Sequence, residues 1–134
     1  MATRTECYVD TSALIAFMDR SDSHHPLFRQ LFSKPPALVT SALVIAEGHG
    51  WFLRRYDASR AVQFLAFIDA LPNLGIQCFD AAALAKAAVV VKKFSDRKLT
   101  LADSHGLSIM SDRRIAVCWS TDRHLSLAGA ALVI

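Results

Sequence analysis

The sequence predicts an α/β fold in which helices cover both faces of a mostly parallel sheet of four or five strands. Short runs of strand-forming residues alternate with longer segments of helical pattern along the chain, and parallel strands need crossover connections of that kind. Of the 134 residues, 53% are hydrophobic and 20% are charged, which is typical of a folded domain. No repeat, low-complexity segment or linker is evident, so we expect residues 1–134 to form a single domain.

Four strands are expected because four short apolar runs are each bounded by turn residues, charges or helix caps. They cover residues 7–10, 37–39, 76–79 and 115–119, and the apolar run at 131–134 is the candidate for a fifth.

Six helices are expected between these strands, and a short turn or helix follows residue 122. Hydroxyl residues or aspartates can cap their first turns, and proline, basic or turn residues follow their last turns. The caps are Thr11 or Ser12, Thr40 or Ser41, Ser59, Asp80 and Thr100, and the helices cover residues 13–19, 24–32, 42–55, 59–70, 81–94 and 101–111.

Charge, cysteine content and the lack of long apolar runs indicate which class of protein to expect. The net charge of +3 is a mild bias toward polyanionic partners. The three cysteines, Cys7, Cys78 and Cys118, are an odd number without a C-x-x-C pair, and each lies in an apolar run. We therefore expect buried, reduced thiols in a cytoplasmic protein. The first residues show no signal-peptide pattern, and no run of apolar residues is long enough to span a membrane.

Four acidic residues can meet at the carboxyl edge of such a sheet, where α/β proteins bind ligands. Asp10 and Asp122 follow the first and fourth strands. Glu47 lies about two turns into its helix, and Asp103 lies in the first turn of another, both with small or apolar neighbours. Crowded carboxylates need a counter-charge, and Mg²⁺ or Mn²⁺ binds carboxylate oxygens. The four acids therefore predict a metal site.

Each acid also has an ordinary structural interpretation. Asp10 can cap the next helix, Asp122 can be a turn residue, and Thr100-x-x-Asp103 matches a capping box. Glu47 on an apolar face is costly without a positive partner, which is either a cation or an arginine from elsewhere in the fold. We favour the cation because the other three acids can reach the same edge.

Other chemistries have less support. The histidines lack an H-x-x-x-H spacing, which disfavours zinc, and no G-x-S-x-G or glycine-rich nucleotide motif is present. Asp80 is interpreted as a helix cap. If the strand order differs from the expected one, Asp80 is the residue that would replace one of the four acids at the metal site. The aromatic side chains are spaced as core or interface residues and not as a base-stacking platform; they are Trp51, Phe52, Phe64, Phe67 and Phe94.

Taken together, these motifs resemble the PIN-domain ribonucleases, and among them the VapC-type toxins of bacterial toxin–antitoxin pairs. The matching segments are Val9-Asp10-Thr11-Ser12, Thr40-Ser41 with Glu47, Leu99-Thr100-Leu101-Ala102-Asp103 and Ser120-Thr121-Asp122-Arg123-His124. The resemblance covers nearly the whole chain, in order and in spacing.

The resemblance implies a three-layer α/β/α sandwich and a metal-dependent endoribonuclease. Asp10, Glu47, Asp103 and Asp122 would be the catalytic, metal-binding acids, and Thr11, Ser12 and Thr121 would be hydroxyls near the metal or the scissile phosphate. Mg²⁺ or Mn²⁺ as cofactor, RNA as substrate, a homodimer and a cognate antitoxin are also implied.

Basic residues beside the acids in sequence are candidate phosphate contacts: Arg123, Lys98, Arg97 and Arg113. Two other classes remain open. A phosphoacceptor signalling domain would use a strand-end aspartate, although it would also want an acidic pair after the first strand. A catalytically inactive module would bind RNA or an antitoxin without cutting.

Gly48 and Gly50 depart from an ordinary helix pattern. Each costs roughly 1 kcal/mol relative to alanine inside a helix. We expect them to admit a close neighbour or a ligand, and to affect the local helix and with it the direction of Glu47.

Overall fold

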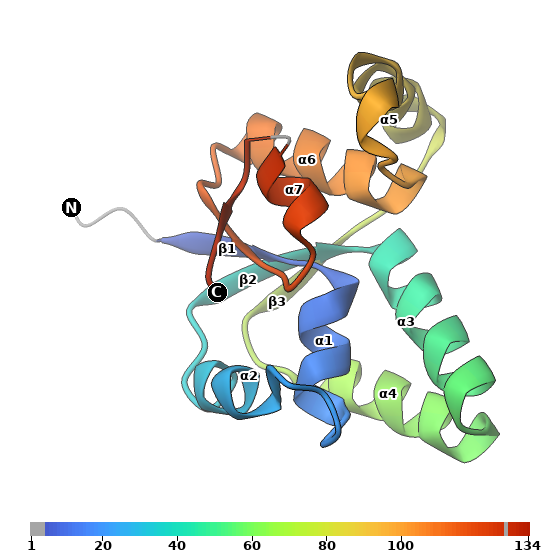
Figure 1. Ribbon diagram of the computed structural model, residues 1–134, viewed down its shortest axis with the longest axis vertical. Coiled ribbons are helices and arrows are strands. Elements are labelled where there is room, and N and C mark those ends of the chain that lie inside the picture. Colours follow the sequence, from blue (N-terminus) through green and yellow to red (C-terminus); the bar gives the residue numbers. More distant parts are fainter. Residues whose placement is uncertain (1–4, 128) are drawn as a thin grey trace.

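The chain forms a sheet of five strands, and the structure, a computed structural model, describes residues 5–127 and 129–134. All neighbouring strands run parallel, in the order β3-β2-β1-β4-β5 (Figure 1). The strands are β1 (Glu6–Val9), β2 (Ala37–Ser41), β3 (Leu74–Gln77), β4 (Val117–Trp119) and β5 (Ala131–Leu132). The predicted fifth strand is thus confirmed.

Helices fill the connections and form two layers. They are α1 (Thr11–Met18), α2 (His25–Leu31), α3 (Ala42–Arg55), α4 (Ala58–Ala70), α5 (Ala81–Lys93), α6 (Leu101–Arg113) and α7 (Arg123–Leu127), with a 3₁₀ turn, η1 (Ser95–Arg97), before α6. In Figure 1, α1 to α4 lie on one side of the sheet and α5 to α7 lie on the other. The predicted α/β/α sandwich is therefore confirmed.

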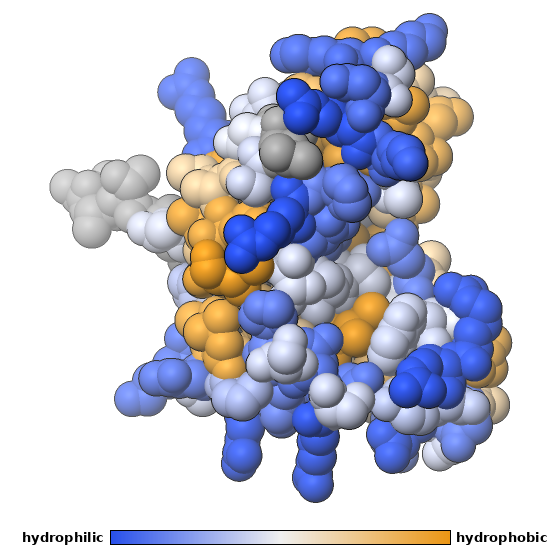
Figure 2. Space-filling view, viewed as in Figure 1, coloured by the Kyte–Doolittle hydropathy of each residue, from blue (hydrophilic) through white to orange (hydrophobic). Residues whose placement is uncertain are grey.

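The core lies where these layers meet the sheet. Phe28 of α2 and Phe32, which follows this helix, pack on Trp119 of β4, with ring centroids 6.5 and 5.0 Å from the indole. Phe17 and Phe67 stack with centroids 4.6 Å apart, which joins α1 to α4. Burial of these large rings supplies much of the hydrophobic stabilisation. On the face seen in Figure 2, hydrophilic side chains lie over the outer helices at both ends of the molecule.

The first residues of α4 and α5 follow directly after the aspartates that cap these helices. Asp57, not Ser59, begins α4, because its carboxylate accepts a hydrogen bond from the backbone N–H of Arg60 at 2.8 Å. Asp80 caps α5 as expected, accepting from the N–H of Ala83 at 2.9 Å. The strand expected at residues 76–79 instead covers Leu74–Gln77, because β3 pairs with β2 from Leu74 onward.

The expectation for one cysteine is wrong. Cys7 and Cys118 are buried, but Cys78 is exposed. It follows β3, which lies at the edge of the sheet, so no second strand flanks this segment on its outer side. All three thiols are free, as expected. Among the described residues, no helix has the length and apolar character required to span a membrane.

Candidate metal centre

Asp10 is buried at the carboxyl end of β1, with 5% of its surface exposed. It begins α1, but its side chain makes no capping hydrogen bond. Instead its Oδ2 accepts hydrogen bonds from the hydroxyls of Ser12, at 2.9 Å, and Ser120, at 3.0 Å. The capping role is therefore excluded, and the carboxylate is held by two hydroxyls.

The register of β1 and β4 brings Asp122 to the same place. Val9 pairs with Trp119, and the N–H of Asp10 donates to the carbonyl oxygen of Trp119 at 3.0 Å. The chain leaving β4 turns over the start of α1, where the N–H of Thr121 donates to Ser12 Oγ at 2.9 Å. Parallel neighbours that end in register place their following residues side by side. The predicted meeting of the two strand-end acids is confirmed.

Asp103 reaches this edge from the first turn of α6. It does form the predicted capping box: its Oδ2 accepts from the N–H of Thr100 at 3.0 Å, and its own N–H donates to Thr100 Oγ1 at 3.1 Å. One turn later, a Cβ on Gly106 would lie 2.8 Å from the Tyr8 hydroxyl oxygen, so α6 packs directly on the end of the Tyr8 side chain. This close approach brings Asp103 to the sheet edge, and capping does not prevent it from facing the other acids.

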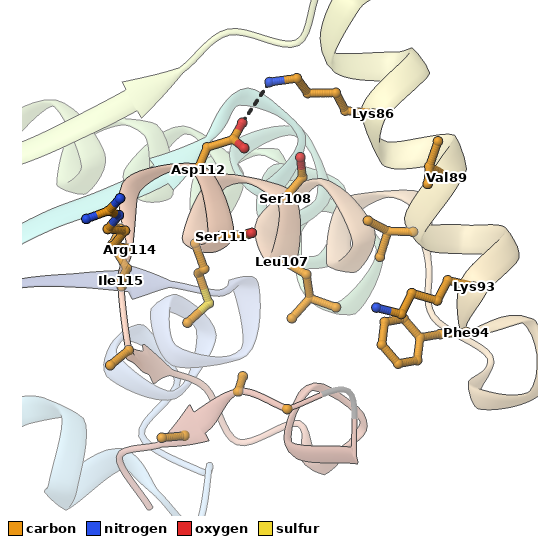
Figure 3. Close-up of a pocket in the computed structure, with 16 residues that line it drawn as sticks. Lys86, Val89, Lys93, Phe94, Leu107, Ser108, Ser111, Asp112, Arg114 and Ile115 are labelled. Carbon is orange, nitrogen blue, oxygen red and sulfur yellow. Dashed lines mark hydrogen bonds and ion pairs between the residues drawn. The ribbon is translucent and has the colours of Figure 1, made fainter.

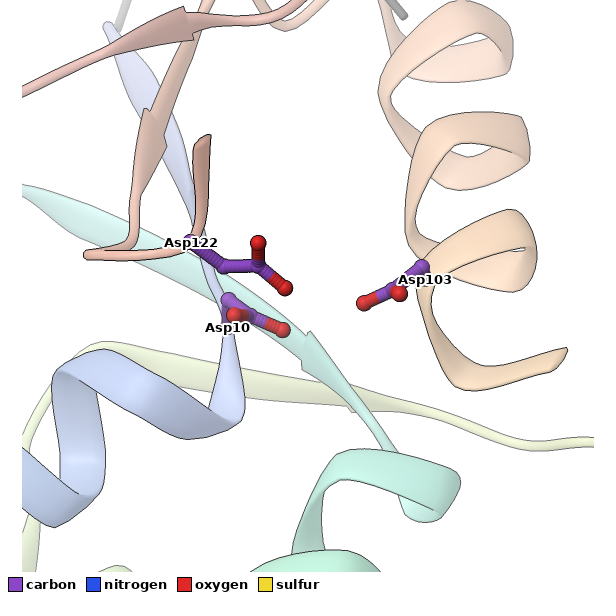
Figure 4. A group of neighbouring side chains, drawn as sticks. All are labelled: Asp10, Asp103 and Asp122. Carbon is purple, nitrogen blue, oxygen red and sulfur yellow. The ribbon is translucent and has the colours of Figure 1, made fainter. Parts of the chain in front are cut away.

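The three aspartates converge. One carboxylate oxygen from each of Asp10, Asp103 and Asp122 lies within 4.8 Å of the other two (Figure 4). Among the residues that the structure describes, no lysine or arginine pairs with any of them. The basic side chain that does lie within ion-pair distance is His124, with its Nδ1 2.8 Å from Asp122 Oδ1. The cluster therefore has no permanent cationic partner.

Burial makes this cluster costly when it is charged. It raises the pKa of Asp10 to about 6, against the lowering effect of the Ser12 hydroxyl, and the charge of Asp103 adds to the rise. Burial also raises the pKa of Asp103, with a further contribution from Asp122. Oxygen donors that crowd together without a counter-charge are the set that a hard divalent cation binds. The three aspartates therefore fit such an ion.

Glu47 does not join this cluster. It lies on α3 and lines a cavity of about 220 Å³ that the three aspartates also line. The side chain is exposed, so the argument that an apolar face makes Glu47 costly is wrong: Val44 is buried in the core, whereas Glu47 and Trp51 both line the open cavity. Among the described residues it forms no ion pair, although Arg54 lines the same cavity.

The expected auxiliary residues fall into two groups. Ser12 and Thr11 line the cavity, and Thr11 Oγ1 is buried without a hydrogen-bond partner. Thr121 contributes its backbone N–H to Ser12, and Arg123 is exposed at the start of α7. Arg113, however, pairs with Glu6 at 2.8 Å, at the opposite end of β1. It is therefore not a phosphate contact at this edge.

Three features of the cavity were missed from the sequence. Ser120 holds Asp10, and Trp51 and Arg54 line the cavity beside Glu47. The latter two lie four and seven residues after Glu47, which is the spacing of one helix face, so the pattern could have revealed them.

A larger cavity lies elsewhere. It measures about 880 Å³ and lies between α5, α6 and the segment before β5 (Figure 3). Its charged groups include Lys86 and Asp112, which pair with each other at 2.9 Å. Because Asp112 is the one acid among the described residues that line it, we place the chemistry in the smaller cavity, which four acids line.

Comparisons with known proteins agree with this fold. The family model of the PIN domain matches residues 7–130. Mycobacterium tuberculosis VapC20, described as a sarcin-ricin loop cleaving toxin, superposes with a TM-score of 0.84 and 24% identity, covering 93% of this chain and 96% of that chain.

Two further structures are more distant. A Klebsiella pneumoniae toxin–antitoxin complex has a TM-score of 0.64 at 16% identity, covering 96% of each chain. DNA-bound VapBC from Salmonella typhimurium has a TM-score of 0.65 at 12% identity, covering 97% of each chain. These likenesses show the fold, and the sequence has no significant match among curated proteins. The match over residues 7–130, with the sheet order and the acidic edge, places the chain in the PIN domain family.

Proposed function

We propose that this protein is a metal-dependent endoribonuclease that hydrolyses RNA phosphodiester bonds, and that it is the toxin of a toxin–antitoxin pair. The observation that carries the proposal is the convergence of Asp10, Asp103 and Asp122, with oxygens within 4.8 Å of one another. Membership of the PIN domain family and the likeness to a toxin described as cleaving an RNA loop support RNA as the substrate.

Asp10, Asp103 and Asp122 would hold Mg²⁺ or Mn²⁺, and Glu47 would act from the cavity wall. A bound divalent ion supplies Lewis-acid polarisation of a phosphodiester and activation of water. The hydroxyls of Ser12 and Ser120 orient the Asp10 carboxylate. The capping box fixes Asp103, and the backbone N–H of His124 donates to Asp122 Oδ1 at 2.9 Å. Each acid is thus held in place by neighbours of its own.

The remaining proposals follow from the same relatives. A cognate antitoxin, a homodimer and a cytoplasmic location are expected of a protein with this role, and the toxin–antitoxin complexes among the similar structures support the antitoxin. We also propose that residues 1–134 act as one domain, which the family match over residues 7–130 supports.

Cleavage of single-stranded RNA with added Mg²⁺ or Mn²⁺, and its loss with EDTA, tests the proposal. Asp122→Asn, Asp103→Asn and Glu47→Gln should each reduce turnover by more than the roughly 10- to 100-fold typical of changes outside the metal ligands. Asp80→Asn is the matched control, because Asp80 caps α5 and does not line the acidic cavity. Normal cleavage by Asp122→Asn and Asp103→Asn would refute the assignment.

The two other classes make different predictions. An inactive binding module would bind RNA without metal-dependent cleavage. A phosphoacceptor domain would gain a phosphoryl group on Asp10 after treatment with acetyl phosphate, detectable by mass spectrometry. We expect neither result, because Asp10 is buried between two serine hydroxyls and two further aspartates.

A further inference from the structure

We propose that Trp51 and Arg54 form a binding site for a nucleotide beside the scissile phosphate. In this site the indole stacks on an unpaired base and the guanidinium binds a backbone phosphate. The inference rests on the proposed ribonuclease function and names the part of the RNA that this face of α3 would bind. It revises the expectation that Trp51 serves only as a core or interface residue.

The first support is position. Glu47, Trp51 and Arg54 all line the cavity that contains the three aspartates. Their spacing of four and three residues places them along one face of α3. A phosphodiester that reached the aspartates would therefore have the indole and the guanidinium beside it, along the same wall.

The second support is the state of Trp51. The indole is half-buried and packs against the hydrophobic core. Its ring lies edge-on to Phe52, with centroids 4.9 Å apart, and to Tyr56, with centroids 6.1 Å apart. These contacts fix the ring, while part of it remains accessible at the cavity. A fixed aromatic ring in an open cavity suits an unstacked base, since every base has a face on which to stack.

The third support is that Arg54 is free to bind. Among the described residues, Arg54 makes no ion pair and no side-chain hydrogen bond, although it shares a cavity with four acids. Its neighbour Arg55 lies over the Tyr56 ring, 5.2 Å from the centroid, and does not line the cavity. A planar guanidinium binds phosphate oxygens with two parallel hydrogen bonds, so an unpaired arginine at an acidic metal site suits the phosphate that must arrive there.

Gly50 supplies the space for this arginine. A Cβ at residue 50 would lie 2.9 Å from Arg54 Nη1, so the guanidinium runs back along α3 toward Glu47. Any larger residue at this position would displace the guanidinium and leave the helix otherwise intact. Gly50 is thus a positioning residue for Arg54, which explains a glycine in mid-helix that packing alone does not require.

Tryptophan fluorescence tests the stacking directly. The chain has two tryptophans, and Trp119 is 3% exposed, so Trp51 provides the emission that responds to a ligand. The probe is a single-stranded 2′-O-methyl oligoribonucleotide of mixed sequence, added to the full chain without Mg²⁺ or Mn²⁺, in the presence and in the absence of Ca²⁺. We expect quenching in the native protein and none in Trp51→Phe. The same sequence annealed into a duplex should quench much less, because its bases are already stacked.

Matched control variants show whether an effect comes from this site or from a general loss of charge or hydrophobic surface. Trp51→Ala is compared with Leu53→Ala, and Arg54→Gln with Arg55→Gln, since Leu53 and Arg55 are exposed on α3 outside the cavity. Trp51→Ala and Arg54→Gln should each weaken oligonucleotide binding and raise the KM for RNA by about tenfold. The loss of kcat/KM on RNA should exceed the loss on methyl p-nitrophenyl phosphate, which has no base and only one phosphate.

Gly50→Ala provides a test that does not alter Arg54 itself. We expect a fold at least as stable as the native one and weaker oligonucleotide binding. The double variant Gly50→Ala with Arg54→Gln should bind no more weakly than Arg54→Gln alone, because both changes remove the same contact.

These experiments test the nucleotide site and the proposed ribonuclease function separately. Metal-dependent RNA cleavage by the native protein, with Trp51→Ala and Arg54→Gln equal to their controls, would overturn the site and leave the ribonuclease standing. No cleavage by the native protein, with quenching that depends on Trp51, would overturn the ribonuclease and leave an RNA-binding site. Quenching that survives in Trp51→Phe would show that the signal does not come from stacking on this ring.

Discussion

Gly48 and Gly50 lie two residues apart in α3, yet a side chain at each would meet a different neighbour. A Cβ at residue 48 would overlap the Phe64 ring, which is fully buried and stacks on Phe52 with centroids 5.5 Å apart. A Cβ at residue 50 would meet only the end of the flexible Arg54 side chain. The two glycines thus have separate purposes: one lets α3 and α4 pack closely, and the other leaves room at the cavity.

We therefore expect alanine to have opposite effects on stability at these positions. Overpacking a core typically costs about 1–3 kcal/mol, and removing a mid-helix glycine returns roughly 1 kcal/mol. Gly48→Ala should lower the free energy of unfolding, and Gly50→Ala should leave it unchanged or raise it slightly. Urea unfolding followed by circular dichroism measures both. Equal stability of the two variants would contradict the packing of Gly48 against Phe64.

At the scale of elements, two serines join the β1–α1 junction to the β4–α7 junction. Ser12 Oγ and Ser120 Oγ lie 3.0 Å apart, and both hydroxyls reach Asp10 Oδ2. Ser120 Oγ also accepts from the N–H of Asp122 at 2.9 Å. These bonds hold the ends of two strands and the starts of two helices in one arrangement, so the acids are placed by the junctions and not by their own side-chain contacts alone.

Ser120→Ala should therefore destabilise the protein and weaken its binding of Mn²⁺. A hydrogen bond to a charged group contributes about 1.5–3 kcal/mol, and the change would also leave the Asp122 N–H without its acceptor. Ser104→Ala is the control: Ser104 is equally buried, but its hydroxyl has no hydrogen-bond partner. Thermal unfolding and Mn²⁺ titration compare them. A loss in Ser104→Ala as large as that in Ser120→Ala would show that burial, and not the link to Asp10, is responsible.

The stability of the whole molecule should depend on pH through the acidic cluster. The pKa of Asp10 is raised from 3.8 to about 6 on folding, so between these values the folded state binds more protons than the unfolded state. Without metal, this group's contribution to stability is full below pH 3.8 and is lost as the pH rises to about 6. The raised pKa of Asp103 acts in the same direction.

A divalent ion competes with those protons, so its effect should grow with pH. We expect Mn²⁺ to raise the Tm more at pH 7.5 than at pH 5, relative to the same protein in EDTA. Titratable groups remote from the site contribute equally to the Tm with Mn²⁺ and with EDTA at a given pH, so their contributions cancel in this comparison. Asp10→Asn should show a smaller Mn²⁺ effect with less dependence on pH. An equal rise in Tm at both pH values in the native protein would contradict a site built on these carboxylates.

Much of this architecture could be predicted from the sequence, because its signals are local. Strand runs that end at Asp10 and just before Asp122 predicted two acids at one edge, and the adjacency of β1 and β4 then brought them together. The direction of Glu47 could not be predicted in this way. The spacing of residues along α3 predicts which of them share a face of that helix. It does not predict the cavity, because the cavity depends on how α3 faces α1 and α6.

Cys78 shows the same limit at the edge of the sheet. An apolar run predicts a strand, but the strand order decides which strand lies outermost, and no local pattern encodes that order. The spacing of Trp51 predicts a packing role, because an aromatic residue on a helix usually packs. Its place on the cavity wall depends on Asp10 and Asp103, which are distant in sequence.

The crossing of four distant chain segments at one sheet edge has a consequence for biosynthesis. Asp10 is translated long before Asp122, and β4 can join β1 only after both have left the ribosome exit tunnel. Until then the three aspartates cannot converge in the nascent polypeptide. Any chemistry of the acidic edge is thereby delayed until the segment that carries β4 has been synthesised and has left the tunnel.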